Sequence, residues 1–247
     1  MSFSQLPPAV LSLIVKHLCE TDRWLAPYAT VNKSWNSVVE ALTFRVIRSN
    51  SIEHLRQIPL HMNVDRWKAL RTIDLIIQLP GYSREKWYEL ENEDDKTTNN
   101  VVFSDSLREA FSVINTWQDA GFQDGGLTLE IQAISKSDYW HLGKVDRISR
   151  RNRVAPGAAD LRLEASYLHL TGELPLLPSV SRLVVRGAHR VRYIPGNPNR
   201  ACCPRLMSGE ATLHIARACP HLESMELELS DNESKDFQLR NTERSST

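Results

Sequence analysis

Residues 6–45 are the stretch of this 247-residue chain that most limits how it can fold. The stretch opens with Leu6-Pro7-Pro8. Proline is tolerated in the first turn of a helix because its φ is already near the helical value, so these residues predict a helix start. Apolar residues then recur at helical spacing and form one stripe on this helix, at Val10, Leu11, Ile14 and Leu18.

Two further helices are predicted in the same stretch. A short one holds Leu25 and Ala29, with Pro27 in its first turn. The next begins after Asn32, a favoured N-cap residue, and carries Trp35, Val38, Val39 and Leu42. Three short helices in about 40 residues cannot enclose this much apolar surface by themselves. We therefore expect part of it to dock on the rest of the chain or on a partner protein.

The ordered set of residues in this stretch resembles an F-box, the helical module that docks on the Skp-family adaptor of cullin–RING ubiquitin ligases. Residues 25–31 with Trp35 and Thr43-Phe44-Arg45 are similar to F-boxes of filamentous-fungal proteins. Two departures are Ala9, where many F-boxes carry Glu, and a longer segment at 19–24. The alternative is an ordinary helical subdomain with these positions in its core. The resemblance assigns adaptor binding to Leu6, Pro7, Leu11, Ile14, Leu18, Val31 and Trp35.

After residue 50, helical and alternating apolar patterns follow one another along the chain. The first is a short helix that Ser51 is predicted to cap and Pro59 to end. Residues 71–80 and 127–133 alternate apolar and polar side chains, which predicts two strands with one buried face each. Between them, residues 81–100 are polar and acidic, and we expect a solvated loop followed by a helix over 104–117. Further strands are predicted at 161–164, 168–170, 181–186 and 221–229, with a loop at 196–199 and a helix over 208–218.

The segment Cys219-Pro220 followed by 221–229 is similar to a leucine-rich repeat, in which L-x-x-L-x-L forms the strand of the concave face. The strands are unevenly spaced, so the expected fold is α/β, a three-helix F-box followed by a short, irregular solenoid. The expected domains are 1–50 for the F-box, 51–229 for the solenoid and 230–247 for a disordered tail. No cap follows the last predicted strand, so we expect an under-protected edge there.

Composition narrows the classes of partner. The chain carries 30 basic and 30 acidic residues, which removes the electrostatic argument for binding nucleic acid or an anionic membrane. No apolar run approaches the roughly 18 residues of a membrane span, and no secretory signal is visible. Four cysteines without a disulfide spacing argue for a reducing compartment. The expected location is cytoplasmic, nuclear or both.

No catalytic constellation stands out. The chain lacks the nucleophile-elbow and phosphate-loop motifs. The basic run 144–153 is expected to be a solvated loop rather than a phosphate site. A zinc site is not expected either, because adjacent cysteines cannot easily share one tetrahedral ion. We expect no metal and no cofactor at the candidate ligands Cys202, Cys203, His214, Cys219 and His221.

The resemblance implies a non-catalytic substrate receptor of a Skp–cullin–F-box ubiquitin ligase. The F-box would dock on the adaptor, and the C-terminal region would hold an unknown target protein near the ubiquitin-loaded enzyme. A second hypothesis is an F-box-like scaffold that binds the adaptor without directing ubiquitination. A third, a small enzyme, would require a pocket with perturbed titratable groups.

Overall fold

Three short helices open the part of the chain that the computed structural model describes, namely residues 6–21, 25–83, 85–88, 91–122, 126–137, 166–187, 192–194, 197–202 and 204–228. They are α1 (Pro8–Thr21), α2 (Ala26–Ala29) and α3 (Lys33–Thr43). The side chain of Asn32 caps α3 by accepting hydrogen bonds from the backbone N–H groups of Ser34 and Trp35. The helices predicted at these three places are therefore confirmed.

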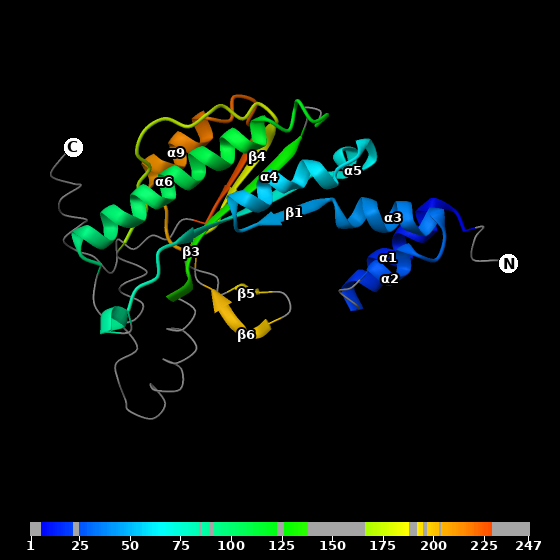
Figure 1. Ribbon diagram of the computed structural model, residues 1–247, viewed down its shortest axis with the longest axis horizontal. Helices are drawn as coiled ribbons and strands as arrows, with labels where there is room; N and C mark the ends of the chain where they lie inside the picture. The colour runs from blue at the N-terminus through cyan, green and yellow to red at the C-terminus, as the bar shows by residue number, and fades with distance from the viewer. Residues whose placement is uncertain are drawn as a thin grey trace.

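A parallel five-stranded sheet forms the body of the molecule (Figure 1). Its strands are β1 (Val46–Ser49), β2 (Thr72–Leu79), β3 (Leu127–Ser135), β4 (Val180–Val185) and β7 (Ser224–Leu227), and their order in the sheet follows the chain. One register row crosses the whole sheet through Ile47, Ile73, Leu129, Leu183 and Met225. The strands predicted around 71–80, 127–133, 181–186 and 221–229 are confirmed, while β1 was not predicted.

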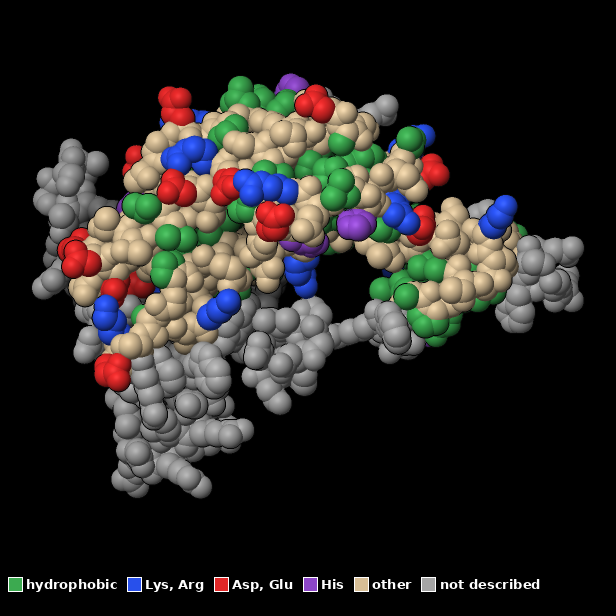
Figure 2. All heavy atoms as spheres, viewed as in Figure 1, with side chains coloured by type: hydrophobic (Ala, Val, Ile, Leu, Met, Phe, Trp, Pro, Cys, Tyr) green, Lys and Arg blue, Asp and Glu red, His purple; other side chains and the backbone are tan. Residues whose placement is uncertain are grey.

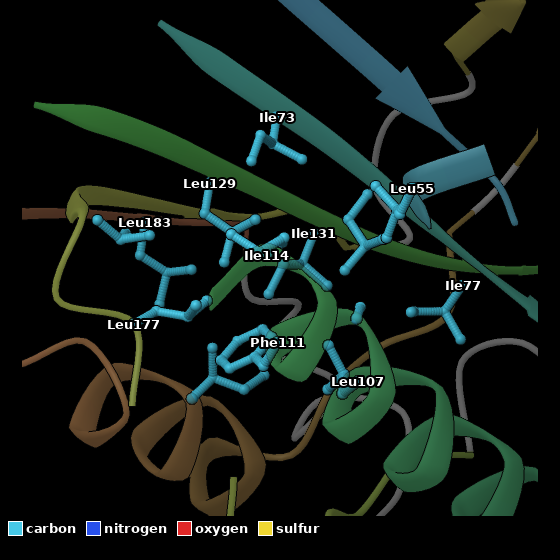
Figure 3. Close-up of a cluster of buried hydrophobic side chains, with 14 of the residues drawn as sticks. Leu55, Ile73, Ile77, Leu107, Phe111, Ile114, Leu129, Ile131, Leu177 and Leu183 are labelled. Carbon is cyan, nitrogen blue, oxygen red and sulfur yellow. The ribbon is translucent and has the colours of Figure 1, made fainter. Parts of the chain in front are cut away.

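Helices cover one face of this sheet. They include α4 (Ile52–His61), α6 (Glu93–Asn115) and α9 (Gly209–Arg217), and the short α5 (Val64–Ala69) follows α4 (Figure 1). Every second strand residue points toward them, as the alternation predicts. Figure 3 shows Leu129 and Ile131 from β3 facing Phe111 and Ile114 from α6, and all four are essentially inaccessible to solvent.

The structure corrects three local predictions. Residues 81–100 are not one loop, because a 3-10 turn, η2 (Glu85–Tyr88), is followed by α6 beginning at Glu93. The Asn92 side chain accepts from Asp95 N, and the acidic residues of the first turn suit the positive end of the helix dipole. Pro59 does not end its helix, which runs on to His61. Of the predicted loop at 196–199, residues 197–199 belong to β6 (Asn197–Cys202), which pairs antiparallel with β5 (Arg192–Ile194), and residue 196 lies outside the described residues.

Some predictions fall on other parts of the chain. The strand at 161–164, the basic run 144–153 and the tail 230–247 lie outside the described residues. At 168–170 the structure has a single bridge, from Leu168 to Met207, in place of a strand.

Candidate functional site

The three N-terminal helices carry a small apolar cluster of their own, which we call the N-terminal module. Its buried side chains are separate from the main core between the sheet and its helices. Leu6, Ile14 and Leu18 pack against the cluster from its border. Its buried members are Leu11, Val15, Leu25, Trp35 and Val39.

The seven residues assigned to adaptor binding divide into two groups in this module. Leu11 and Trp35 are 2% and 7% exposed, so they hold the helices together. Pro7 and Val31 are exposed, Val31 at 55%, while Leu6, Ile14 and Leu18 are half-buried. The structure therefore places part of the predicted set inside the module and part on its surface.

Two exposed apolar residues on α1 extend that surface. Val10 is 40% exposed and Leu13 is 68% exposed, and residues three apart lie on the same side of a helix. Figure 2 shows hydrophobic side chains gathered on the lower side of the module. We define the module's apolar surface as Pro7, Val10, Leu13 and Val31. The sequence-based set of adaptor-binding residues did not include Leu13. Its spacing of three residues from Val10 on the same helix could have identified it.

Trp35 anchors the inside of the module. Its ring stacks on Tyr28 of α2 with centroids 6.3 Å apart. Among the described residues its indole Nε1 is buried without a hydrogen-bond partner. A buried donor without a partner costs about 1–3 kcal/mol. The packing of the Trp35 ring offsets this cost and keeps the side chain buried.

Arg66 of α5 joins the module to the body. Its Nη2 donates to Glu40 Oε1 of α3 at 2.7 Å, and its guanidinium lies 4.5 Å from the ring centroid of Phe44. This hydrogen bond, with the positive charge of the guanidinium, lowers the pKa of Glu40 below its ordinary value. The junction therefore contains an ion pair and a cation–π contact rather than a continuous apolar core.

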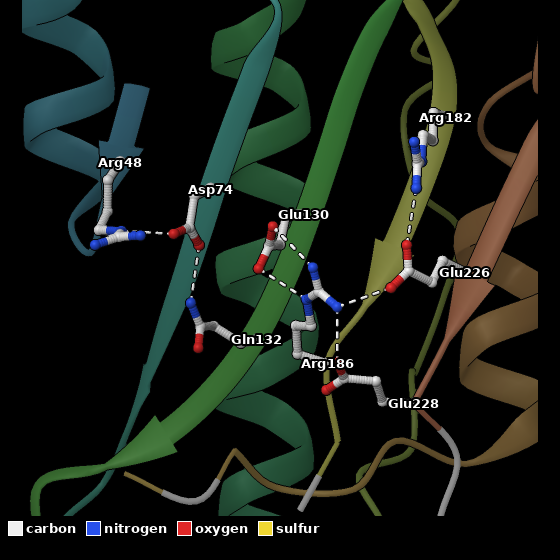
Figure 4. Close-up of polar contacts among 8 residues, drawn as sticks. All are labelled: Arg48, Asp74, Glu130, Gln132, Arg182, Arg186, Glu226 and Glu228. Carbon is white, nitrogen blue, oxygen red and sulfur yellow. Dashed lines mark hydrogen bonds and ion pairs between the residues drawn. The ribbon is translucent and has the colours of Figure 1, made fainter. Parts of the chain in front are cut away.

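The sheet face opposite the helices is polar (Figure 4). On its β1 side, Arg48 Nε donates to Asp74 Oδ2 at 2.5 Å, and Gln132 Nε2 donates to Asp74 Oδ1 at 2.8 Å. The side chain of Asp74 is only 3% exposed. Two donors thus satisfy a buried carboxylate in the middle of the sheet.

Arg186, directly after β4, is the centre of the other half of this face. Its guanidinium pairs with Glu130 at 2.8 Å, Glu226 at 3.0 Å and Glu228 at 2.7 Å, while Arg182 pairs with Glu226 at 2.8 Å. Burial disfavours its charge, but these carboxylates outweigh burial and raise the pKa of Arg186. The hydrogen bond from Arg182 lowers the pKa of Glu226, with Arg186 adding to the effect. This half of the face is therefore a network of ion pairs that joins β3, β4 and β7.

A buried ion pair that the sequence did not predict lies at the start of α6. Arg205 Nη1 donates to Glu91 Oε1 at 2.9 Å, and both side chains are 2% exposed. Asn99 Nδ2 and Ser166 Oγ also donate to the Glu91 carboxylate. Since the two charged residues are 114 positions apart, no local pattern could have paired them. This network connects three segments that are distant in the sequence. The donors named here all bond to the Glu91 carboxylate rather than to solvent.

Of the candidate metal ligands, Cys203 lies outside the described residues. Within the described part of the chain, no three His, Cys, Asp or Glu side chains are arranged to hold a metal ion. Cys219 is buried, and burial raises the pKa of its thiol to about 12. His221 Nδ1 lies 3.0 Å from the Pro178 carbonyl oxygen. Of the helices in the described ranges, none has the length and apolar character needed to cross a membrane.

Comparisons with known proteins identify no relative. No protein-family model matches the chain, and neither the curated proteins nor the solved structures contain a match.

Proposed function

We propose that this chain is a substrate-recognition subunit of a Skp–cullin–F-box ubiquitin ligase, with the N-terminal module as its F-box. The observation that carries the proposal is the module itself. Its helices coincide with the F-box-like residue pattern, they bury five large apolar side chains in a cluster of their own, and they leave Leu13 and Val31 largely exposed. Exposed apolar groups on a small module favour a protein partner.

The architecture of the body supports the second part of the proposal, the binding of a target protein. Its strands are parallel and ordered along the chain, with helices on one face, which supports a short leucine-rich-repeat-like solenoid that presents a target. Such a receptor acts by proximity: it raises the effective concentration of target lysines near the ubiquitin-loaded enzyme. It needs no catalytic residue of its own.

The first experiment is co-expression with a Skp-family adaptor followed by size-exclusion chromatography. We expect a one-to-one complex with the unaltered chain. Leu13→Asp combined with Val31→Asp places two charges on the module's apolar surface and should abolish co-elution. The matched control is Leu60→Asp in α4, because Leu60 is even more exposed, at 81%, but lies outside the module. Equal loss of binding in the control would remove the support for this interface.

Trp35, Leu6 and Pro7 of the predicted set make a second test. Trp35→Ala should unfold the module and so abolish adaptor binding, while Leu6→Ala with Pro7→Ala should weaken binding with less effect on the module's helices. In both variants the sheet should remain folded, as read by hydrogen exchange in β2 and β3. If both variants still co-purify with the adaptor, the interface assignment is wrong.

Ligase output is tested separately from docking. A target captured by the chain should fall in abundance only when the adaptor is present, and the Leu13→Asp, Val31→Asp variant should prevent the fall. A chain that binds the adaptor and its target but leaves the target's abundance unchanged would be a scaffold rather than a ligase subunit.

A further inference from the structure

The two edge strands of the sheet, β1 and β7, are attached to it in different ways. Each pairs four residues with a single neighbour. β1 also buries Ile47 in the main core, at 8% exposed, and Ser49 at 1%. β7 is the one strand of these five without a buried residue: Met225 is 46% exposed, and Leu227 is half-buried at the border of the core. Apolar burial therefore holds β7 less firmly than β1.

Ion pairs on the polar face supply a second attachment for β7 (Figure 4). Glu226 of β7 pairs with Arg182 and Arg186, and Glu228, just after the strand, also pairs with Arg186. Glu130 of β3 holds the Arg186 guanidinium from the other side at 2.8 Å, so the arginine keeps a partner if β7 moves. The side chains of Glu226 and Arg182 are about half-exposed, which leaves this pair open to screening by salt.

The chain that leads into β7 is anchored separately, by α9. Ile215 of α9 is fully buried in the main core, and Ala218 and Cys219 at the end of the helix are at most 4% exposed. Leu222, between the helix and the strand, is half-buried against the same core. Opening at β7 therefore leaves α9 in place, because the helix contacts the core through its own residues.

We infer that β7 is a switch strand, held on the sheet by the carboxylates of Glu226 and Glu228: when their pairing with the arginines is screened or removed, β7 separates from β4 while β1 to β4 stay folded. A local opening that breaks few apolar contacts costs less free energy than global unfolding. Separation frees the carbonyl oxygens of Ser181 and Val185, which accept from the backbone N–H groups of Glu223 and Glu228 in the closed state. The open state thus presents a sheet edge at β4 that the closed strand covers.

Three backbone amides report the relevant openings in the full chain. Glu228 N donates to Val185 O across the β4–β7 pair, Thr72 N donates to Arg45 O at the β1 edge, and Thr128 N donates to Arg71 O in the middle of the sheet. Hydrogen exchange of these amides is measured by NMR in low salt and in sodium chloride at about 1 M, where the Debye length falls to about 3 Å.

We expect salt to accelerate exchange at Glu228 about tenfold and at Thr72 and Thr128 less than about twofold. The other edge strand serves as the internal reference, since β1 is anchored by buried Ile47. An equal response at Glu228 and Thr72 would mean that β7 is no more dependent on charge than β1, and an equal response at Thr128 would mean that the sheet opens as one unit. Either result overturns the proposal.

Substitutions on the β7 side alone separate the ion pairs from the backbone attachment. Glu226→Gln combined with Glu228→Gln keeps the shape of both side chains, removes their charges and leaves the Arg186–Glu130 pair intact. We expect exchange at position 228 to accelerate about tenfold in low salt, with little further response to sodium chloride.

The matched control is Glu223→Gln, because Glu223 is exposed just before the strand and forms no ion pair in the described part of the chain. This variant should keep the exchange rate and the salt response of the unaltered chain. A double variant that behaves like the control would show that the carboxylates do not hold β7. Acceleration at Thr128 by the same factor as at position 228 would show global destabilisation and would equally refute the switch.

The adaptor has no part in these readouts, so the switch strand and the F-box proposal can fail separately. A chain whose β7 opens with salt but which ignores the adaptor would contradict the F-box proposal alone.

Discussion

The N-terminal module and the sheet-centred body differ in how they enclose apolar surface. The module buries five large hydrophobic side chains, whereas the body's core is continuous across all five strands and the helices packed on them. In the module, Leu13 and Val31 stay more than half exposed. In the body, the alternating residues of β2 and β3 that face the helices are almost fully buried. The body therefore encloses its large apolar side chains more fully than the module does.

The two parts meet through a polar junction, which allows their stabilities to differ. Arg66 bridges to Glu40 and Phe44, and the buried clusters on either side remain separate. A small cluster alone supplies little stability, and a partner that binds only the folded module adds to it by mass action. Substitutions on either side of the junction show whether the two regions unfold independently.

The largest effect is expected from Phe111→Ala in α6. Phe111 is fully buried between α6 and the sheet, and truncating a buried phenylalanine costs about 3–5 kcal/mol. The control Leu60→Ala changes an 81% exposed residue and should stay within about 0.5 kcal/mol of the unaltered chain. Urea unfolding followed by circular dichroism measures both. A cost for Phe111→Ala as small as that of the control would mean that α6 does not pack as described.

Leu11→Ala should have a large but local effect. Leu11 is 2% exposed in the module's cluster, and its truncation should cost about 2–4 kcal/mol of local stability. We expect hydrogen exchange to accelerate in α1–α3 while β2 and β3 keep their protection. Equal acceleration in the sheet would show that module and body unfold as one unit.

The sequence predicts the elements of this fold well where local patterns decide them. The alternation of Ile73, Leu75, Ile77 and Leu79 fixed both the strand and its buried face, and all four are at most 4% exposed. Ser51 and Ser208 stand at the starts of two predicted helices, and the side chain of each accepts a backbone hydrogen bond there, as an N-cap does. The start of α6 was misplaced because its first turns are polar, and there the Asn92 cap rather than apolar periodicity marks the helix.

What the sequence could not predict depends on contacts between distant residues. Glu91 and Arg205 form a buried ion pair, but in the sequence alone nothing distinguishes either residue from an ordinary surface charge. Arg186 is a second residue whose role depends on distant contacts. It is the centre of an ion-pair network only because β3, β4 and β7 lie side by side. For the candidate site, the residue pattern predicted three helices that the structure contains, but only the structure separated buried Leu11 and Trp35 from exposed Val31.

Gly187→Ala should loosen β7 from the rest of the body. A Cβ added at Gly187 would lie 2.0 Å from the carbonyl oxygen of Glu228, so the backbone after β7 must move. We expect a cost of about 1–3 kcal/mol, with faster exchange in β7 than in β2. The matched control is Gly209→Ala, where nothing lies within 4 Å of the added Cβ. A destabilisation equal in the two variants would show that the close approach at Gly187 has no role.

The smallest effect is expected at the junction, from Arg66→Met. The Glu40 pair is partly exposed, so its loss should cost about 1 kcal/mol or less, and the Phe44 contact adds about 0.5–1 kcal/mol at most. Because the pKa of Glu40 is lowered in the folded chain, the pair stabilises above the unfolded-state pKa of about 4.3. That contribution is lost as the pH falls through the lower folded-state value. The difference between Arg66→Met and the unaltered chain, measured by urea unfolding, should therefore be larger at pH 7 than at pH 3, and salt should reduce it. A difference that is independent of pH and salt would mean that Arg66 acts there through its contact with Phe44 and its packing alone.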